Sequence, residues 1–156
     1  MKKEIGIRHC RYSDIRFFPR LMLGALLAFG CTISGIADET TSLVGTSWLA
    51  EDIDGRGVID MLQSTLTFES DVRVIGMGGC NAFFGTAKLD GENLELGPLG
   101  STRMACAESI MDQESHFFAA LETARRYRLD PETDLLYFTN AQDDTILRFS
   151  RLTVTE

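Results

Sequence analysis

Gly78-Gly79-Cys80-Asn81-Ala82-Phe83-Phe84-Gly85 is the stretch of this 156-residue chain that constrains its backbone most strongly. Its paired glycines reach backbone angles that are closed to other residues, and its asparagine can hydrogen-bond neighbouring backbone. A second compact stretch, Ser101-Thr102-Arg103-Met104-Ala105-Cys106, ends in another cysteine. We therefore expect a tight turn that holds Cys80 toward Cys106.

The chain around these stretches predicts short strands. Polar and apolar side chains alternate with period two between turn residues, which is the pattern of half-buried strands. Asp90-Gly91 is a strong hairpin signal, because both residues tolerate positive φ. We expect hairpins at 63–68 with 72–76 and at 86–89 with 93–96. The full set of expected strands is 48–53, 63–68, 72–76, 86–89, 93–96, 100–104, 127–129, 135–138 and 145–149.

One helix interrupts the strands. Apolar residues recur at three- and four-residue steps, as in an amphipathic helix, at Ile110, Met111, Phe117, Phe118, Leu121 and Ala124. Ser109 and Asp112 have the spacing of a capping box, and Asp112 and Glu114 suit the positive end of the helix dipole. The fold class is therefore α+β, a single domain in which a curled antiparallel sheet of about eight strands packs on one α-helix.

Both motifs resemble those of the META domain, the HslJ-like family of small envelope proteins. The resemblance runs over about residues 45–149 and depends on the GCNxxxG element at Cys80 and the TRMAC element that ends at Cys106. It implies a twisted, partly open β-barrel with the helix packed against it. It also implies an association with stress tolerance, without an established reaction.

Residues 1–37 have the pattern of an export signal. Six basic residues outnumber two acidic ones before an apolar run at 21–33, which is too short for a comfortable membrane span. Small residues at positions 35 and 37 predict cleavage before Asp38, which leaves residues 38–156 as the META/HslJ-like domain. The alternative is a lipoprotein signal that ends before Cys31. We expect an exported, periplasmic protein, whose membrane contact is limited to this signal or to a lipid anchor at Cys31 in the outer membrane.

The cysteine count supports the same compartment. Cys10 and Cys31 fall in the leader, so Cys80 and Cys106 remain as a lone pair. In an exported chain such a pair predicts one disulfide, and closing a loop of roughly 27 residues stabilises the fold by about 3–4 kcal/mol. Two buried free thiols, or a redox-active pair, are the alternatives.

The charge balance excludes some partners. Residues 38–156 carry 9 basic and 21 acidic side chains, a net charge of −12. Nucleic acids and anionic lipid headgroups need clustered lysine and arginine, so we expect neither as a partner. Asp52, Asp54 and Asp60 lie in an acidic stretch, but they lack the spacing of an EF-hand. We expect no metal and no cofactor.

The motifs also contain a candidate binding rim. Its residues are Gly79, Asn81, Phe83, Phe84, Gly85, Thr102 and Arg103. Arg103 suits an anionic group, because its planar fork matches carboxylate or phosphate. In an extended segment Phe83 and Phe84 face opposite sides. Either the second ring is covered by the loop at 61–62 or by the helix, or it opens a groove for an apolar ligand or a partner strand.

These features favour a non-enzymatic envelope protein that supports stress tolerance. It would act through a protein-interaction surface or a small apolar pocket, with an envelope protein or a small apolar ligand as partner. A small hydrolase is one alternative, using His116, the only histidine of residues 38–156, with a carboxylate. No nucleophile motif accompanies His116, so no catalytic residue is assigned. An inhibitor-like module that presents the Cys80–Phe84 loop is the other alternative.

Overall fold

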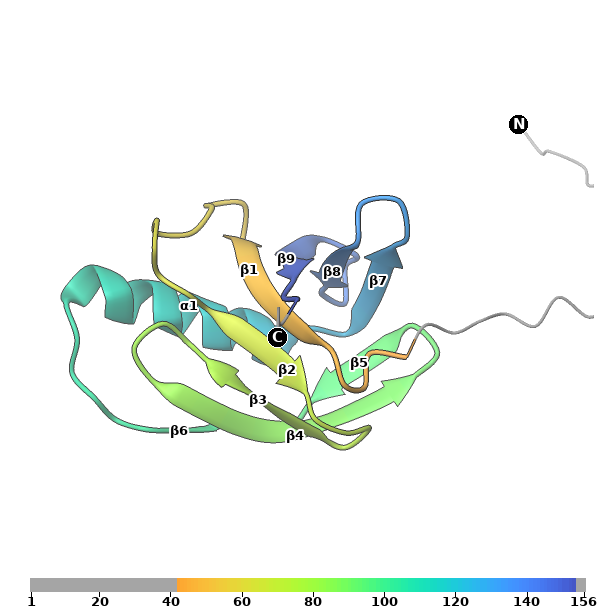
Figure 1. The fold of residues 1–156 in the computed structure, drawn as a ribbon, viewed down its shortest axis with the longest axis horizontal. Helices are drawn as coiled ribbons and strands as arrows, with labels where there is room; N and C mark the ends of the chain where they lie inside the picture. Colours follow the sequence, from red (N-terminus) through yellow and green to blue (C-terminus); the bar gives the residue numbers. More distant parts are fainter. Residues whose placement is uncertain (1–41, 154–156) are drawn as a thin grey trace, which may run out of the picture. The chain divides into compact units, whose positions relative to one another are not determined.

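The computed structural model describes residues 42–153, which form nine strands and one helix (Figure 1). The strands are β1 (Ser47–Ile53), β2 (Thr65–Phe68), β3 (Arg73–Met77), β4 (Ala82–Asp90), β5 (Asn93–Leu96), β6 (Gly100–Ser101), β7 (Arg126–Asp130), β8 (Leu135–Thr139) and β9 (Thr145–Arg151). The helix is α1 (Glu108–Thr123). The predicted signal at 1–37 and the acylation site at Cys31 lie outside the described residues.

The strands form a closed antiparallel barrel. Eight of them follow the order β3-β2-β1-β9-β8-β7-β5-β4, and pairing of β3 with β4 completes the ring. The α+β class is confirmed in broad terms, but the expectation of a partly open barrel is wrong. The ninth strand, β6, lies outside the ring and pairs with β4.

The length of β4 explains why the barrel closes. Its first half, at 82–86, pairs with β3, and its second half, at 87–90, pairs with β5 on the opposite edge. The expected strand at 86–89 was therefore too short, and the hairpin that joins β3 to β4 was not foreseen. Gly76 allows this close pairing, because a Cβ atom there would overlap the Thr65 carbonyl oxygen and the Phe83 ring.

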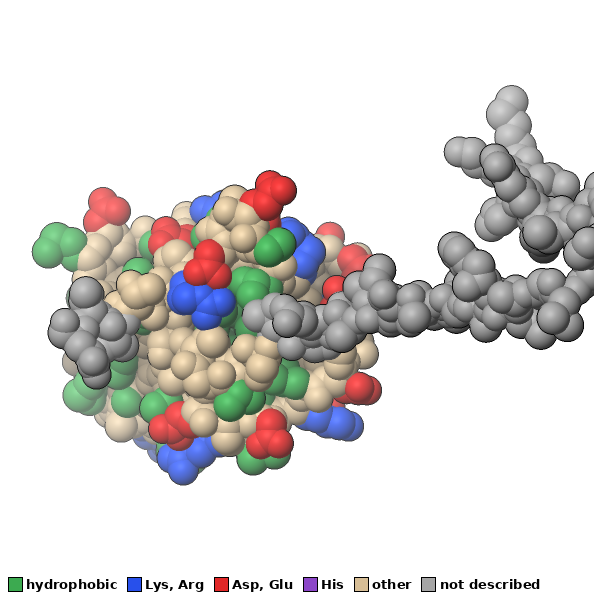
Figure 2. Space-filling model, turned by 45° about the vertical axis from the view of Figure 1, so that its right-hand side comes forward, with side chains coloured by type: hydrophobic (Ala, Val, Ile, Leu, Met, Phe, Trp, Pro, Cys, Tyr) green, Lys and Arg blue, Asp and Glu red, His purple; other side chains and the backbone are tan. Residues whose placement is uncertain are grey.

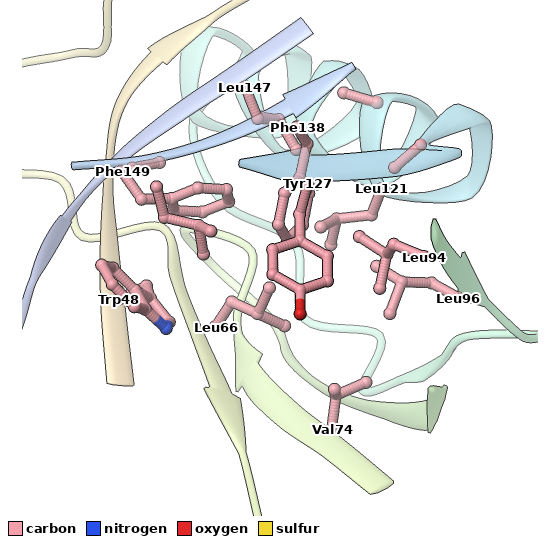
Figure 3. Close-up of a cluster of buried hydrophobic side chains, with 14 of the residues drawn as sticks. Trp48, Leu66, Val74, Leu94, Leu96, Leu121, Tyr127, Phe138, Leu147 and Phe149 are labelled. Carbon is pink, nitrogen blue, oxygen red and sulfur yellow. The ribbon is translucent and has the colours of Figure 1, made fainter. Parts of the chain in front are cut away.

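The core fills the barrel and extends under the helix (Figure 3). Side chains on alternate strand positions point inward and are almost completely buried, including Trp48, Leu66, Phe138 and Phe149. From α1, the predicted stripe residues Phe117 and Leu121 are buried in the same cluster. The Phe117 ring lies edge-on to Phe83 at 6.0 Å and to Phe149 at 6.3 Å, an arrangement that aromatic pairs favour.

The helix ends differ from the sequence-based expectation. The N-cap is Ala107, which makes no side-chain capping bond, so the predicted capping box of Ser109 and Asp112 is wrong. At the other end Arg125 Nη1 donates to the carbonyl oxygens of Glu122 and Ala124, and so satisfies groups that the helix leaves unpaired. No helix within residues 42–153 is long and apolar enough to cross a lipid bilayer.

Tyr127 on β7 places a hydroxyl group in the hydrophobic core. Its ring is buried, and Figure 3 shows the hydroxyl pointing among aliphatic side chains of facing strands. Burial, with a smaller contribution from the charge of Glu92, raises the pKa of this hydroxyl. The folded protein therefore holds the Tyr127 proton more tightly than the unfolded chain does.

We predict a loss of stability at alkaline pH that depends on Tyr127. Above about pH 10 the unfolded chain releases the proton while the folded chain retains it, so the free energy of unfolding falls as pH rises. Tyr127→Phe should reduce this fall in urea titrations at pH 8 to 11. Tyr137→Phe, on the neighbouring strand, should leave the fall in place. Equal slopes for Tyr127→Phe and the unmodified protein would contradict the prediction.

Candidate functional site

The Gly-Gly-Cys-Asn stretch is the loop of the β3–β4 hairpin. Gly78 N donates to Asn81 O at 2.8 Å and closes the loop. Gly79 has a φ of 138°, a conformation that side-chain-bearing residues rarely adopt, and the Leu62 side chain packs over it. The sequence predicted a backbone conformation here that requires glycine, and Gly79 adopts it at the tip of the hairpin that closes the barrel.

A disulfide joins this tip to the segment that leads into the helix. The structure contains the predicted bond between Cys80 and Cys106, whose Cα atoms are 6.2 Å apart. Cys80 is buried, and the bond closes a loop with a sequence separation of 26 residues. The hairpin and the start of α1 are thus held together covalently.

A carboxylate from the helix lies beneath the same loop. Glu114 is only 4% exposed. Its Oε2 accepts hydrogen bonds from Cys80 N at 2.9 Å and from Asn81 N at 2.6 Å, and its Oε1 accepts one from Asn81 Nδ2 at 2.7 Å. These three hydrogen bonds are charge-assisted, because their acceptor is a carboxylate. Such bonds are about twice as strong as hydrogen bonds between neutral groups. Glu114 therefore fixes the turn from the inside.

Asn81 connects this carboxylate to the second motif. Its side-chain oxygen accepts from Thr102 Oγ1 at 2.8 Å and from Met104 N at 2.7 Å. Its amide nitrogen also donates to Met104 O at 3.3 Å. The buried Asn81 side chain thus holds the extended segment before Cys106 at three points, which explains why the two motifs occur together.

Glu114 was missed as a site residue. The sequence suggested only an interaction with the helix dipole, whereas the carboxylate is buried and binds the hairpin loop. The available signal was its position, because Glu114 lies three residues before Phe117 and seven before Leu121 and so shares the apolar stripe of the helix. A carboxylate on such a stripe requires buried donors.

An open hollow of 430 Å³ lies over this framework. It is lined by Asn81, Ser101, Thr102, Arg103, Met104, Ala105, Cys106, Met111, Glu114 and Phe118, and its exposed lining is mainly apolar. The structure therefore brings together three residues of the predicted rim, Asn81, Thr102 and Arg103. It does not bring Gly79, Phe83 or Gly85 to the hollow.

The two adjacent phenylalanines take opposite sides of β4. Phe83 is buried in the core, whereas Phe84 is 61% exposed. The expected cover by the loop at 61–62 is wrong, because Leu62 packs over Gly79 and leaves the Phe84 ring on the surface. The sequence left two alternatives, a covered or an exposed second ring, and the structure has the exposed ring.

Two apolar side chains share the outer face of the hairpin with Phe84, the half-buried Ile75 and the exposed Met77. Register places Ile75 opposite Phe84 and Met77 opposite Ala82, so these residues share the outer face of the hairpin. Met77 is 37% exposed, and Met104, at the hollow, is 55% exposed. We call Ile75, Met77, Phe84 and Met104 the apolar collar of the disulfide-braced turn.

His116 lies in a different hollow, between α1 and the loop after β1. Its Nε2 lies 2.9 Å from Arg56 Nη1 and 3.7 Å from Asp112 Oδ1, so both neighbours share one ring nitrogen. Ser109 also lines this hollow. It lies seven residues before His116 on the helix, about 10 Å along the axis, which is beyond hydrogen-bond reach. The side chains do not form a nucleophile–base–orienter arrangement.

The acidic loop after β1 organises its own backbone. The Asp52 carboxylate accepts hydrogen bonds from Gly55 N at 2.7 Å and Gly57 N at 2.9 Å. Within residues 42–153, no group of three His, Cys, Asp or Glu side chains is placed to hold a metal ion. Acidic and basic side chains lie interspersed on the face drawn in Figure 2, and neither sign forms a continuous patch there.

The family model of the META domain matches residues 41–152. A protein from Burkholderia xenovorans, solved by NMR, is 28% identical with a TM-score of 0.61, over 74% of this chain and 87% of that one. A second NMR structure, 23% identical with a TM-score of 0.56 over 71% and 92% of the two chains, shares the fold. No curated protein matches the chain significantly.

We predict that Glu114→Ala lowers the free energy of unfolding by about 3 kcal/mol or more, because buried N–H groups lose their acceptor. Glu114→Gln retains an acceptor oxygen and should have an intermediate effect. Glu122→Ala, an exposed glutamate on the same helix, is the matched control and should change stability by no more than about 0.5 kcal/mol. Urea titrations with an unchanged slope measure these differences. Similar midpoints for Glu114→Ala and Glu122→Ala would contradict the role assigned to Glu114.

We also predict that the disulfide forms in protein produced in an oxidising compartment. Mass spectrometry of the denatured chain should show that Cys80 and Cys106 react with an alkylating reagent only after reduction. The double variant Cys80→Ser, Cys106→Ser should be less stable by about 3–4 kcal/mol, because the unfolded chain regains the freedom of the open loop. Reduced unmodified protein is the control and should match the double variant. Alkylation without reduction would refute the bond.

Proposed function

This chain belongs to the META domain family, and from that premise we propose that it is a non-enzymatic domain of the cell envelope. Its role is to support the envelope under stress by binding apolar segments of envelope proteins or small apolar ligands. The binding surface consists of the apolar collar and the adjoining hollow. The single observation that carries this proposal is the exposure of the collar around the motif turn.

The collar presents large apolar side chains on the outer face of the hairpin and, through Met104, at the hollow. Phe84 and Met104 are each more than half exposed, and Met77 and Ile75 lie beside Phe84 on the same face. Contiguous exposed apolar groups mark binding sites more often than scattered ones do. Methionine side chains are flexible and polarisable, so they suit partners of varied shape.

The framework beneath the collar favours binding with little loss of conformational entropy. Asn81 holds the Thr102–Met104 segment, and the disulfide fixes Cys106 behind it. A preorganised surface loses less freedom when a partner binds. The hollow of 430 Å³ also falls within the range of small-ligand pockets, roughly 300–1,000 Å³.

The geometry around His116 gives less support to the hydrolase alternative. One ring nitrogen of His116 contacts both Arg56 and Asp112, and Ser109 is out of reach of the ring. The inhibitor-like alternative also has less support, because the loop tip turns Cys80 and Asn81 inward. A loop that inserts into a partner needs side chains that project from its tip.

The export proposal rests on the leader pattern at 1–37 and on the cysteine pair. A lone pair bonded as Cys80–Cys106 suits an oxidising compartment such as the periplasm. Cleavage before Asp38 would release the domain, and acylation of Cys31 would tether it to the outer membrane. Both routes present the same collar to the envelope space.

We predict that the protein binds an apolar fluorescent dye and a permanently unfolded, carboxymethylated polypeptide at micromolar concentrations. Met104→Asp should weaken both interactions about tenfold, because a charged group would have to be desolvated at the collar. Val72→Asp is the matched control. Val72 is 61% exposed, in the β2–β3 turn outside the collar, and its replacement should leave binding unchanged. Fluorescence titration and anisotropy measure the two affinities. Absence of association at micromolar concentrations would refute the proposed function.

A further inference from the structure

The strand outside the barrel leaves one sheet edge open. β6 stands at the end of the strand order and pairs only with β4 through Ser101 with Phe83 and Gly100 with Phe84. In Figure 1 it lies beside β4, outside the ring of eight strands. The other edge of β6 therefore has no strand partner within residues 42–153. Such an edge presents backbone donors and acceptors to a further strand.

The hydrogen-bond pattern identifies the open groups. Thr102 N donates to Ala82 O at 3.0 Å, so the backbone of Thr102 faces β4. In an antiparallel ladder successive residues direct their backbone groups to opposite edges. The N–H and C=O groups of Ser101 therefore point to the open edge.

This edge is short but rigid. Gly100–Ser101 is only two residues long, and the chain beyond it is held to the Asn81 side chain through Thr102 and Met104. The disulfide at Cys106 fixes the far end of the segment. An added strand would therefore meet backbone groups that are already in place.

The side chains around the edge define the chemistry of an occupant. Phe84 lies against Gly100, where a Cβ atom would come within 2.7 Å of the Phe84 ring. Met104 and the apolar hollow follow on the other side of Ser101. Arg103 also lines the hollow, is exposed, and has no carboxylate within 4.0 Å among the described residues, which is true as well of Arg56, Arg125 and Arg148.

From these observations we propose that the β6 edge binds an extended polypeptide segment as an added strand, with apolar residues against Phe84 and Met104 and in the hollow and an acidic residue on Arg103. This inference rests on the proposed function and names the form in which the partner is bound. Main-chain bonds at an edge provide affinity and alternate side chains provide specificity.

The observations favour this occupant over two others. A small apolar ligand fills the hollow but leaves the Ser101 backbone and Arg103 without partners. A second copy of the chain would bring a second Arg103 to the same short edge, and like charges at close range oppose pairing. An extended segment with one carboxylate satisfies the backbone edge, the cation and the apolar side chains together.

Backbone methylation of the partner tests the proposal directly. The probe is a fluorescein-labelled eight-residue peptide of alternating apolar and polar residues with one central aspartate. Two isomers carry N-methyl groups on odd or on even residues, so each lacks the N–H donors of one edge. We expect their dissociation constants to differ about tenfold or more, because only one edge of the peptide pairs with β6. Equal dissociation constants for the two isomers would overturn the added strand.

Variants of the protein test the roles of the Ser101 backbone and of the Arg103 side chain. Ser101→Pro removes the outward N–H, at an edge position where proline is tolerated, and should weaken the unmethylated peptide roughly fivefold while the urea midpoint is retained. Arg103→Gln should abolish the preference for the aspartate peptide over its asparagine analogue. Lys88→Gln, on the distant half of β4, is the matched control and should retain that preference.

The outcomes separate this inference from the proposed function. Equal binding of both methylated isomers, with loss of binding in Met104→Asp, would retain the apolar surface and overturn the added strand. Failure of the unmethylated peptide, the dye and the unfolded polypeptide would overturn both. A concentration-dependent dimer that Ser101→Pro abolishes would assign the edge to a second copy, and would also overturn the proposal.

Discussion

The buried carboxylate of Glu114 is the interaction on which the rest of this structure depends. It accepts hydrogen bonds from the backbone of Cys80 and Asn81 at the tip of the hairpin that closes the barrel. Without these bonds, backbone donors enclosed between helix and sheet would have no acceptor. The same bonds orient the Asn81 side chain, which in turn holds the Thr102–Met104 segment. One helical side chain therefore links the tip of the closing hairpin, the helix and the wall of the hollow.

The disulfide and the glycines act around this carboxylate. Gly78 and Gly79 provide the tight loop, and the Cys80–Cys106 bond limits how far the helix entry can separate from it. These motif residues thus mainly stabilise the fold. The exposed apolar side chains that they support belong to other residues. Phe84 and Met104 project from a framework that cannot easily rearrange, and they meet the open edge of β6. A rigid framework with adaptable apolar side chains suits recognition of varied extended segments.

Much of the fold could be predicted from the local pattern of polar and apolar residues in the sequence. Period-two alternation located the strands to within a few residues, and the change of period at Ile110 located the helix. Apart from the capping box at the start of the helix, the errors concern contacts between distant parts of the chain. The strand at 86–89 actually begins at Ala82, because its first half pairs with β3. The site was only partly predicted. Thr102 and Arg103 were predicted as rim residues and line the hollow, whereas Glu114 was expected only to interact with the helix dipole.

By itself the sequence determined the α+β class, the Asp90-Gly91 hairpin, the need for glycine at the Cys80 turn and the identity of the two cysteines that pair. The first three are properties of short windows, because side-chain periodicity and allowed backbone angles act locally, whereas the cysteine pair followed from the count of cysteines outside the leader. The tertiary structure alone decided that the barrel closes, that Phe83 turns inward while Phe84 turns outward, and that Glu114 is buried beneath the loop. The physical reason is that each of these outcomes requires backbone groups and side chains from separate strands and the helix to meet, and a buried carboxylate is tolerated only where such groups supply its donors.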